Sequence, residues 1–295
     1  MKIGIFLPTF DRALDPEVLT ALAETAEAVG AASLWVPEHV ILTDTYESRY
    51  PYSDDGKLPT AAASGGPADP ITVLSFLAAV TKRVRLGTGI CLVPQRNPVY
   101  TAKEVATLDV LSRGRVDFGI GVGWLAEEFA AVGVPFARRA GRTRAYLDVM
   151  RRLWTDEIAE YAGEFYTLPP VRMDPKPVQR PHPPILVGGE SDAALGRAAE
   201  YGQGWFGWNV TPEMVAERVG VLRGLLAARG RRIEDLRLLA SPYLRATRDL
   251  EAMKRYRDAG AGEVVVLLSR FDGVDGARAV VEKIGTRLVA PAEAL

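Results

Sequence analysis

Short apolar segments that lack a two-residue alternation recur along the whole chain. The candidate strands are Ile3–Leu7, Ser33–Val36, Val84–Ile90, Val116–Val122, Pro184–Val187, Gly204–Trp208, Leu236–Tyr243 and Gly262–Leu268. Unbroken apolar runs of this length are typical of parallel strands that are buried on both faces. Between them, apolar residues recur at helical spacing, as in the stripe made by Leu19, Leu22, Ala23, Ala26 and Val29.

Several predicted helices have clear start and stop signals. A good N-cap residue precedes proline at Asp15-Pro16, Asp69-Pro70, Asn97-Pro98 and Thr211-Pro212, and Gly30 and Gly260 follow helices. About eight strand-then-helix units predict one domain, residues 1–295, folded as an α/β (β/α)₈ TIM barrel. A doubly wound open sheet has the same alternation, and the number of strands alone does not exclude it.

Two long segments interrupt the alternation. Residues 43–69 follow the second strand and are rich in Tyr, Pro, Ser and Gly, and residues 157–183 carry an aromatic patch and then a proline-rich run. Long loops inside a compact domain are usually functional lids or disordered. We expect both insertions, after strands 2 and 4, to cover the active site.

Composition narrows the classes of protein. Thirty-six basic residues oppose thirty-seven acidic ones, so the charge gives no reason to expect nucleic acid or an anionic membrane as partner. The single cysteine, Cys91, excludes an intrachain disulfide and suits a reducing compartment. No apolar stretch approaches the roughly 20 residues of a membrane span. The chain is expected to be cytoplasmic.

The sequence lacks the residues that several classes of enzyme need. The only histidines are His39 and His182, and no ligands for a metal cluster together, so no metal is expected. A Schiff-base enzyme needs a desolvated lysine on a strand, and here only Lys2 stands at the start of one. A phosphate-binding Walker loop and a Gly-x-Ser-x-Gly elbow are both absent.

A glycine run, Gly119-Ile120-Gly121-Val122-Gly123, ends the fourth strand and leads into Trp124. It fails the dinucleotide fingerprint, because the third glycine would fall on Trp124. Small residues here would let a flat ring approach the backbone beside the indole. Glycine would equally relieve crowding at a barrel corner. Both interpretations remain open.

The turn Gly188-Gly189-Glu190-Ser191 follows the fifth strand and opens a helix. Free N–H groups and the helix dipole favour an anion there, so Ser191 would bind a phosphate or simply cap the helix.

His39 is the only histidine at a predicted strand end, and Glu38 precedes it. A lone histidine is more often structural, but an adjacent acid favours proton transfer near neutral pH. Trp205 and Trp208 flank the end of the sixth strand, and one of them is expected to face a ligand.

The chain resembles the luciferase-like monooxygenase superfamily, and within it the group of F420-dependent oxidoreductases. The stretches that carry the resemblance are Leu34-Trp35-Val36-Pro37-Glu38-His39, Tyr50–Gly56, Arg85-Leu86-Gly87-Thr88-Gly89, Pro94-Gln95-Arg96-Asn97-Pro98, Gly119–Glu128 and Pro183–Gly189. They run in family order and spacing from the first strand through the sixth, and residues beyond about 210 match more loosely.

The resemblance implies a TIM barrel with a deazaflavin (F420) or flavin (FMN) at its carboxyl end. It places Glu38 and His39 against the ring, although many relatives have aspartate at the first position. It implies a non-proline cis peptide at Gly89 and Ile90 behind the ring. Gly121, Gly123 and Trp124 would border the ring, and Gly188, Gly189 and Ser191 would bind the phosphate. Trp208, at the end of the sixth strand, is the tryptophan that we expect to contact the cofactor.

The predicted function is hydride transfer between F420 and a small organic substrate, with His39 and Glu38 as catalytic residues. The alternatives are an FMN-dependent monooxygenase that uses oxygen, and a barrel that binds the cofactor without catalysis. Because relatives often dimerise through barrel helices, a homodimer is expected.

Overall fold

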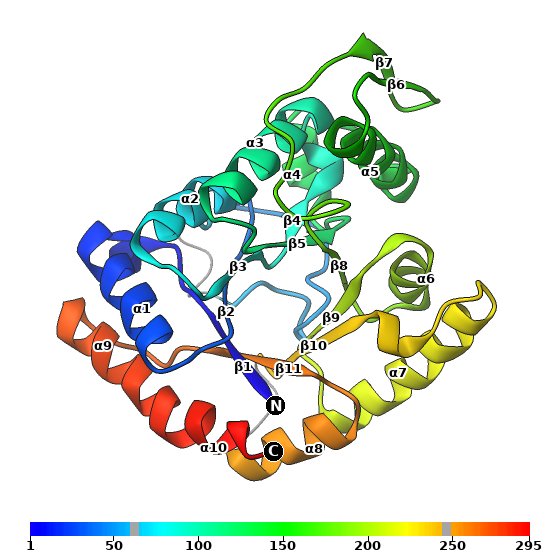
Figure 1. Cartoon of the computed structure of the whole chain (residues 1–295). Coiled ribbons are helices and arrows are strands. Elements are labelled where there is room, and N and C mark those ends of the chain that lie inside the picture. The colour runs from blue at the N-terminus through cyan, green and yellow to red at the C-terminus, as the bar shows by residue number, and fades with distance from the viewer. Residues whose placement is uncertain (60–64, 244–248) are drawn as a thin grey trace.

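The computed structural model describes residues 1–59, 65–243 and 249–295. In these stretches eight parallel strands close into a barrel, and helices form an outer ring around it (Figure 1). The barrel strands, in order around the closed sheet, are β1 (Lys2–Phe6), β2 (Ser33–Val36), β3 (Arg85–Thr88), β5 (Val116–Gly121), β8 (Ile185–Gly188), β9 (Gly204–Trp208), β10 (Arg237–Ser241) and β11 (Glu263–Leu267). Because β11 pairs with β1, the TIM barrel is confirmed and the open sheet is excluded.

The outer ring follows the strands in chain order. Its helices are α1 (Pro16–Ala28), α2 (Pro70–Val80), α3 (Pro98–Leu111), α4 (Ala126–Ala131), α5 (Arg139–Thr155), α6 (Asp192–Tyr201), α7 (Pro212–Ala227), α8 (Leu250–Asp258), α9 (Gly273–Ile284) and α10 (Ala290–Glu293). Short 3₁₀ turns cover Asp11–Leu14, Val93–Gln95 and Ile233–Asp235, and a π turn covers Gly285–Val289. None of the helices in the described part of the chain is long and apolar enough to cross a membrane.

The predicted helix starts are confirmed. The side chains of Asp15, Asp69, Asn97 and Thr211 each accept hydrogen bonds from backbone N–H groups in the first turn of the helix that follows, and proline holds the first helical position. These caps fix where each helix leaves the carboxyl end of the barrel.

The predicted third strand is divided in two. Its first part is β3, the peptide bond Gly89–Ile90 is cis as the resemblance implied, and β4 (Cys91–Leu92) then pairs with β5. This break redirects the chain at the carboxyl end of the barrel, next to the glycine run of β5.

The barrel interior has its own small core. Phe6, Trp35, Leu186, Phe206 and Val265 are buried there together with Leu239, while a larger core lies between strands and helices. Trp205 is fully buried and belongs to the outer core, whereas Trp208 is partly exposed at the end of β9. The interior is therefore filled by side chains rather than open as a channel.

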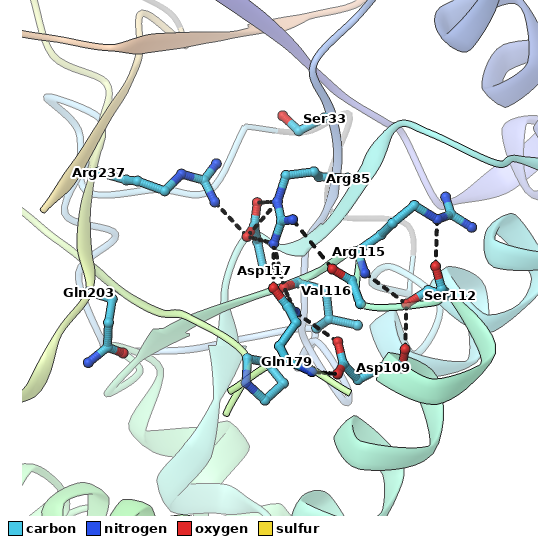
Figure 2. A network of polar contacts seen from close by, with 12 residues as sticks. Ser33, Arg85, Asp109, Ser112, Arg115, Val116, Asp117, Gln179, Gln203 and Arg237 are labelled. Atoms are coloured by element: carbon cyan, nitrogen blue, oxygen red, sulfur yellow. Dashed lines mark hydrogen bonds and ion pairs between the residues drawn. The ribbon is translucent and has the colours of Figure 1, made fainter. Parts of the chain in front are cut away.

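A charged network closes the amino end of the barrel (Figure 2). The carboxylate of Asp117 is fully buried and accepts hydrogen bonds from Arg85 at 2.9 Å and from Arg237 at 2.6 Å. Arg237 also pairs with Glu263 at 3.2 Å, and Gln179 accepts a hydrogen bond from Arg85. Asp117, Arg85, Arg237 and Glu263 lie at or near the first positions of their strands, so we expect the catalytic site at the opposite end of the barrel.

The two expected covering segments differ in position. Residues 43–59 pack over the carboxyl end of the barrel, and residues 60–64 of this segment lie outside the described residues. Residues 157–183 need a correction. They form the hairpin β6 (Ala159–Ala162) and β7 (Thr167–Val171) beside α5, and Gln179 then contacts Asp109 near the amino end. A segment that connects a helix to the next strand starts and ends at that end of a barrel, so most of it cannot cover the site.

Candidate functional site

Residues from five strand ends gather at the carboxyl end of the barrel. His39 follows β2, Trp124 follows β5, Glu190 follows β8, Trp208 ends β9 and Tyr243 follows β10. In TIM barrels this end carries the active site, because the loops after the strands converge there.

His39 is held by a buried carboxylate. Its Nδ1 lies 3.1 Å from Oε2 of Glu128, a fully buried residue in the first turn of α4. Glu128 also accepts hydrogen bonds from the Val40 N–H at 2.7 Å and from Gln95 Nε2 at 3.1 Å. Burial alone would raise the pKa of Glu128, but the hydrogen bonds from His39, Gln95 and Val40 outweigh it and lower the pKa.

The ionised Glu128 fixes the role of each histidine nitrogen. A carboxylate only accepts, so Nδ1 of His39 must carry the hydrogen. Nε2 then holds a lone pair when the ring is neutral and a second proton when it is charged, so it can give or take a proton. Our sequence-based predictions did not assign a role to Glu128, although two consecutive glutamates just after Trp124 were a visible signal.

Glu38 is engaged elsewhere. Its buried carboxylate pairs with Arg96 and accepts a hydrogen bond from the Leu92 N–H. Arg96 also pairs with Asp69, the N-cap of α2, and with Glu104 of α3 at 3.3 Å. Glu38 therefore anchors the turn that follows the cis peptide. Its predicted contact with a cofactor ring stays a prediction.

The glycines at the strand ends leave room for neighbouring side chains. A Cβ atom at Gly121 would lie 1.7 Å from Cδ1 of Ile90, and one at Gly188 would lie 3.0 Å from Cγ2 of Ile90. At Gly89 a Cβ would lie 2.7 Å from the Phe6 ring, and at Gly123 2.7 Å from the Phe129 ring. Crowding thus accounts for these glycines, and contact of their backbone with a cofactor stays a prediction.

Tyrosines of the covering segment pack on Trp124. The ring centroid of Trp124 lies 5.9 Å from His39, 5.7 Å from Tyr46 and 5.2 Å from Tyr50, and each pair meets edge to face. Tyr50 in turn lies 5.4 Å from Tyr52. This aromatic cluster roofs the site and leaves His39 only partly exposed at the mouth.

Two side chains tie the covering segment down. Oε1 of Glu127 accepts hydrogen bonds from the N–H groups of Glu47 at 2.7 Å and Ser48 at 3.1 Å, and Asn209 donates to the Tyr52 carbonyl at 3.0 Å. Desolvation of Glu127 opposes these contacts, but its hydrogen bonds with Ser48 and Glu47 prevail and lower its pKa to about 2. Glu127 is therefore a permanently ionised anchor.

Glu190 lies across the mouth from His39. Its carboxylate accepts a hydrogen bond from the Trp208 N–H at 2.5 Å and is hydrogen bonded to the Tyr52 hydroxyl. Burial raises the pKa of Glu190 to about 7, although these hydrogen bonds oppose the shift. The Trp208 ring packs between Phe6 and Tyr243, with both ring centroids 4.7 Å away.

The predicted phosphate turn has the expected backbone form. Gly189 adopts φ +107°, which favours glycine, and its carbonyl accepts a hydrogen bond from Trp205 Nε1 at 2.8 Å. The Ser191 hydroxyl oxygen accepts from the Ala194 N–H at 3.2 Å and caps α6. The capping interpretation is therefore confirmed, and the phosphate contact of Gly188, Gly189 and Ser191 stays a prediction.

Several buried polar atoms at the carboxyl end of the barrel have no partner among the described residues. Besides Oγ1 of Thr43 and Oε2 of Glu127, which belong to the covering segment and its anchor, they include Oγ1 of Thr9 after β1, Oε1 of Gln95 after β4 and Oγ of Ser241 at the end of β10. Buried polar atoms normally form hydrogen bonds. Unpartnered polar atoms around an aromatic mouth fit a flat ring with polar edges, as in a flavin or deazaflavin. In the same stretches of chain, no group of three His, Cys, Asp or Glu side chains could hold a metal ion.

Comparison with known proteins gives a consistent family. The family model described as luciferase-like monooxygenase matches residues 1–283. An uncharacterized protein of Mycobacterium tuberculosis (strain ATCC 25618 / H37Rv) is 36% identical over 294 residues, 98% of this chain and 99% of the relative.

Relatives with a stated activity use two different cofactors. The FMNH(2)-dependent dimethylsulfone monooxygenase of Pseudomonas putida is 30% identical over 169 residues, 56% of this chain and 46% of that protein. The coenzyme F420-dependent tetrahydromethanopterin reductase from Methanopyrus kandleri superposes with a TM-score of 0.76 over 98% of both chains, at 17% identity, which shows the fold alone. The protein is an enzyme of the oxidoreductase class, and the chain belongs to the luciferase-like monooxygenase family.

Proposed function

We propose that the protein is an F420-dependent oxidoreductase that transfers a hydride to or from a small organic substrate. The observation that carries the proposal is the His39–Glu128 pair, which presents Nε2 of His39 as a proton donor or acceptor under an aromatic roof. When bound, the deazaflavin supplies or accepts the hydride at its ring carbon. The chain supplies position, a water-poor site and a proton.

Each part of the site has a stated task in this proposal. The backbone at Gly89, Ile90, Gly121 and Gly123 and the Trp124 and Trp208 rings would border the cofactor ring. Thr9, Gln95 and Ser241 would satisfy its polar edges with their unpartnered atoms. Gly188, Gly189 and Ser191 would bind the phosphate at the start of α6.

Proton transfer belongs to His39 in this proposal. Reduction of a substrate carbonyl needs a proton at oxygen as the hydride reaches carbon, and oxidation of an alcohol needs that proton removed. Nε2 of His39 can perform both tasks because Glu128 holds the hydrogen on Nδ1. Glu38 would support the site through Arg96 and Leu92 rather than by transferring a proton.

A flavin monooxygenase is the second candidate. It is favoured by the 30% identity to an FMNH(2)-dependent enzyme. In that case His39 would serve oxygen chemistry on reduced flavin, and the same roof would protect the reactive ring from water.

A fluorescence titration with F420 and, separately, with FMN tests the proposal. Tight F420 binding with weak FMN binding supports it and justifies a screen of carbonyl and alcohol substrates. The reverse preference moves the enzyme to the flavin monooxygenases. Binding of neither ring overturns the site assignment.

The expected homodimer also stays a proposal, as do the cytoplasmic location and the absence of a nucleic-acid partner. Exposed apolar side chains on α3 support a dimer, because Tyr100 is 72% and Leu111 is 61% exposed. Light scattering of the purified protein and of Tyr100→Glu tests this. A dimer that the substitution dissociates supports α3 as interface, and a monomeric wild type refutes the proposal.

A further inference from the structure

A cavity of about 290 Å³ lies between α5 and α6, outside the barrel and away from His39. These two helices are neighbours in the outer ring (Figure 1), but α5 packs mainly on α3 and α6 on α7. Its lining consists of small residues and of basic and polar ones: Ala140, Gly141, Ala193, Gly196, Arg144, Arg197, Arg229, Glu200 and Tyr201.

Arg197 is a half-buried cation without a partner. Its guanidinium forms no hydrogen bond or ion pair with any residue in the described stretches. Burial lowers its pKa, and the neighbouring charge of Arg144 adds to that shift. A partly desolvated cation without a counter-charge is unfavourable, so an anion in the cavity would relieve this cost.

Tyr201 supplies a second unused donor. Its side chain is 94% buried, since only 6% is exposed, and its hydroxyl has no partner among the described residues. Burial raises the pKa of Tyr201 to about 12, so the hydroxyl keeps its proton at neutral pH. It lines the same cavity as Arg197. An ammonium or guanidinium donor beside a hydroxyl donor is a typical pair for an oxyanion.

The other charges of the cavity are already neutralised or engaged. Arg144 pairs with Glu200 at 2.6 Å, so this carboxylate does not compete for Arg197. Arg229 donates to the Leu225 carbonyl at 2.8 Å but has no carboxylate partner in the described part of the chain. The cavity therefore keeps a net positive charge.

The cavity begins where the candidate phosphate site ends. It follows α6 from Ala193 to Tyr201, and Ser191 caps the same helix. Eight residues of helix span about 12 Å, which is longer than one phosphate needs and suits a chain with several carboxylates. Arg139 donates to the Gly123 carbonyl at the mouth, and the charge of Arg197 contributes to its lowered pKa, after burial. Positive charge thus extends from the mouth to the cavity.

We propose that the cavity between α5 and α6 is an anion subsite that binds the carboxylates of an acidic cofactor tail beyond the phosphate. The inference rests on the proposed F420 function. F420 carries glutamates beyond its phosphate, whereas FMN ends at its phosphate. The subsite therefore distinguishes the two cofactors by their tails rather than by their rings.

Binding titrations with cofactors of different tail length test the inference. The wild type is expected to bind F420 with several glutamates about tenfold more tightly than F420 without glutamates. Arg197→Ala and Tyr201→Phe should remove most of this preference and leave the affinity for the tail-less form unchanged. Arg197→Lys should retain part of it. The matched control is Arg172→Ala, an exposed arginine of the segment after β7.

Equal affinity for both tail lengths overturns the inference, as does a preference that survives in Arg197→Ala. Failure of the proposed function gives a different result, because F420 then fails to bind tightly at either tail length, whether or not FMN binds. Calorimetry with an oligo-γ-glutamate alone tests the subsite without the ring, and the wild type should bind it while Arg197→Ala should not. Equally strong binding of inorganic phosphate would assign the subsite to a free anion and overturn the tail assignment.

Discussion

At the scale of single residues, the chemistry depends on which nitrogen of His39 carries a proton. Glu128 settles this through one contact of 3.1 Å, and it is itself held ionised by Gln95 and the Val40 N–H. The carboxylate lies within the protein, while the imidazole is partly exposed at the mouth. Glu128 therefore orients the imidazole, and His39 exchanges the proton.

Replacing Glu128 by Gln should slow the reaction without lowering the affinity for the cofactor. The amide has the same shape but no negative charge. It can donate as well as accept a hydrogen bond, so Nδ1 of His39 need no longer carry the hydrogen. We expect kcat to fall about 10- to 100-fold, as for partners that orient a reactive histidine, and His39→Ala to lose about 10²- to 10⁴-fold. Steady-state kinetics and a fluorescence titration measure the two effects. Loss of binding with unchanged kcat would contradict this role.

Glu190 should make stability depend on pH. The pKa of Glu190 is raised to about 7 in the folded protein, so between its ordinary value near 4.5 and pH 7 the folded state holds a proton that the unfolded state has lost. This contribution is complete below pH 4.5 and is lost as the pH rises through 7. It amounts to at most about 3 kcal/mol.

The substitution Glu190→Gln isolates this contribution. Between pH 5 and pH 8 the variant should lose less of its free energy of unfolding than the wild type does, as urea denaturation at both pH values would measure. Glu157→Gln, at an exposed carboxylate, is the control. Identical pH dependence in wild type and Glu190→Gln would show that Glu190 titrates normally.

Sequence reasoning found the residues whose signal is local. His39 stood out as the only histidine at a strand end, and the pair Gly89–Ile90 followed from the family resemblance. Glu128, Tyr52 and Glu190 were missed because their importance depends on contacts between distant segments. The Tyr52–Glu190 pair, for example, joins residues that lie far apart in the chain.

At the scale of elements, the covering segment 43–59 has hydrogen bonds of its own, and α4 and the residue after β9 attach it to the barrel. Glu127 of α4 binds two of its N–H groups, and Asn209 after β9 binds the Tyr52 carbonyl. The two attachments lie at different points of the segment, so we expect loss of one of them to loosen part of the segment and leave the barrel intact.

Replacing Glu127 by Ala should loosen this segment. The N–H groups of Glu47 and Ser48 would lose their shared acceptor, so we expect faster hydrogen exchange in residues 46–59 and a raised KM, with the barrel strands unaffected. Hydrogen exchange monitored by mass spectrometry measures it. Unchanged exchange in 46–59 would show that Asn209 and the aromatic contacts hold the segment by themselves.

The sequence predicted where elements begin better than where connections lie. Apolar runs located every barrel strand, and capping residues located four helix starts, because both signals are local. The break after β3 came only from the resemblance. Segment 157–183 was misplaced because length and composition indicate an insertion but not which end of the barrel it occupies.

At the scale of the whole molecule, one buried carboxylate joins three strands at the amino end. Asp117 of β5 binds Arg85 of β3 and Arg237 of β10 (Figure 2). Arg237 also pairs with Glu263 of β11. The contact between Asp117 and Arg237 crosses the barrel, so it couples β5 and β10, two strands that do not pair with each other.

Asp117→Ala should destabilise the whole barrel. It would leave Arg85 and Arg237 facing each other without their shared anion, and loss of one partner of a buried ion pair costs about 3–5 kcal/mol. Urea denaturation measures this, and cofactor affinity of the folded fraction should not change. A loss below about 1 kcal/mol would mean that Gln179 and water replace the carboxylate.

The filled amino end of the barrel affects the order in which reactants bind and dissociate. The charged network and the interior aromatic residues fill the barrel below the site, so we expect every reactant to enter and leave at the carboxyl end, beside Trp124. The reactant that binds deepest, against Ile90, should bind first and dissociate last. The enzyme should therefore bind its two reactants in a compulsory order. The reactant nearer the mouth would be exchanged in every turnover, while the one bound deeper stays in place.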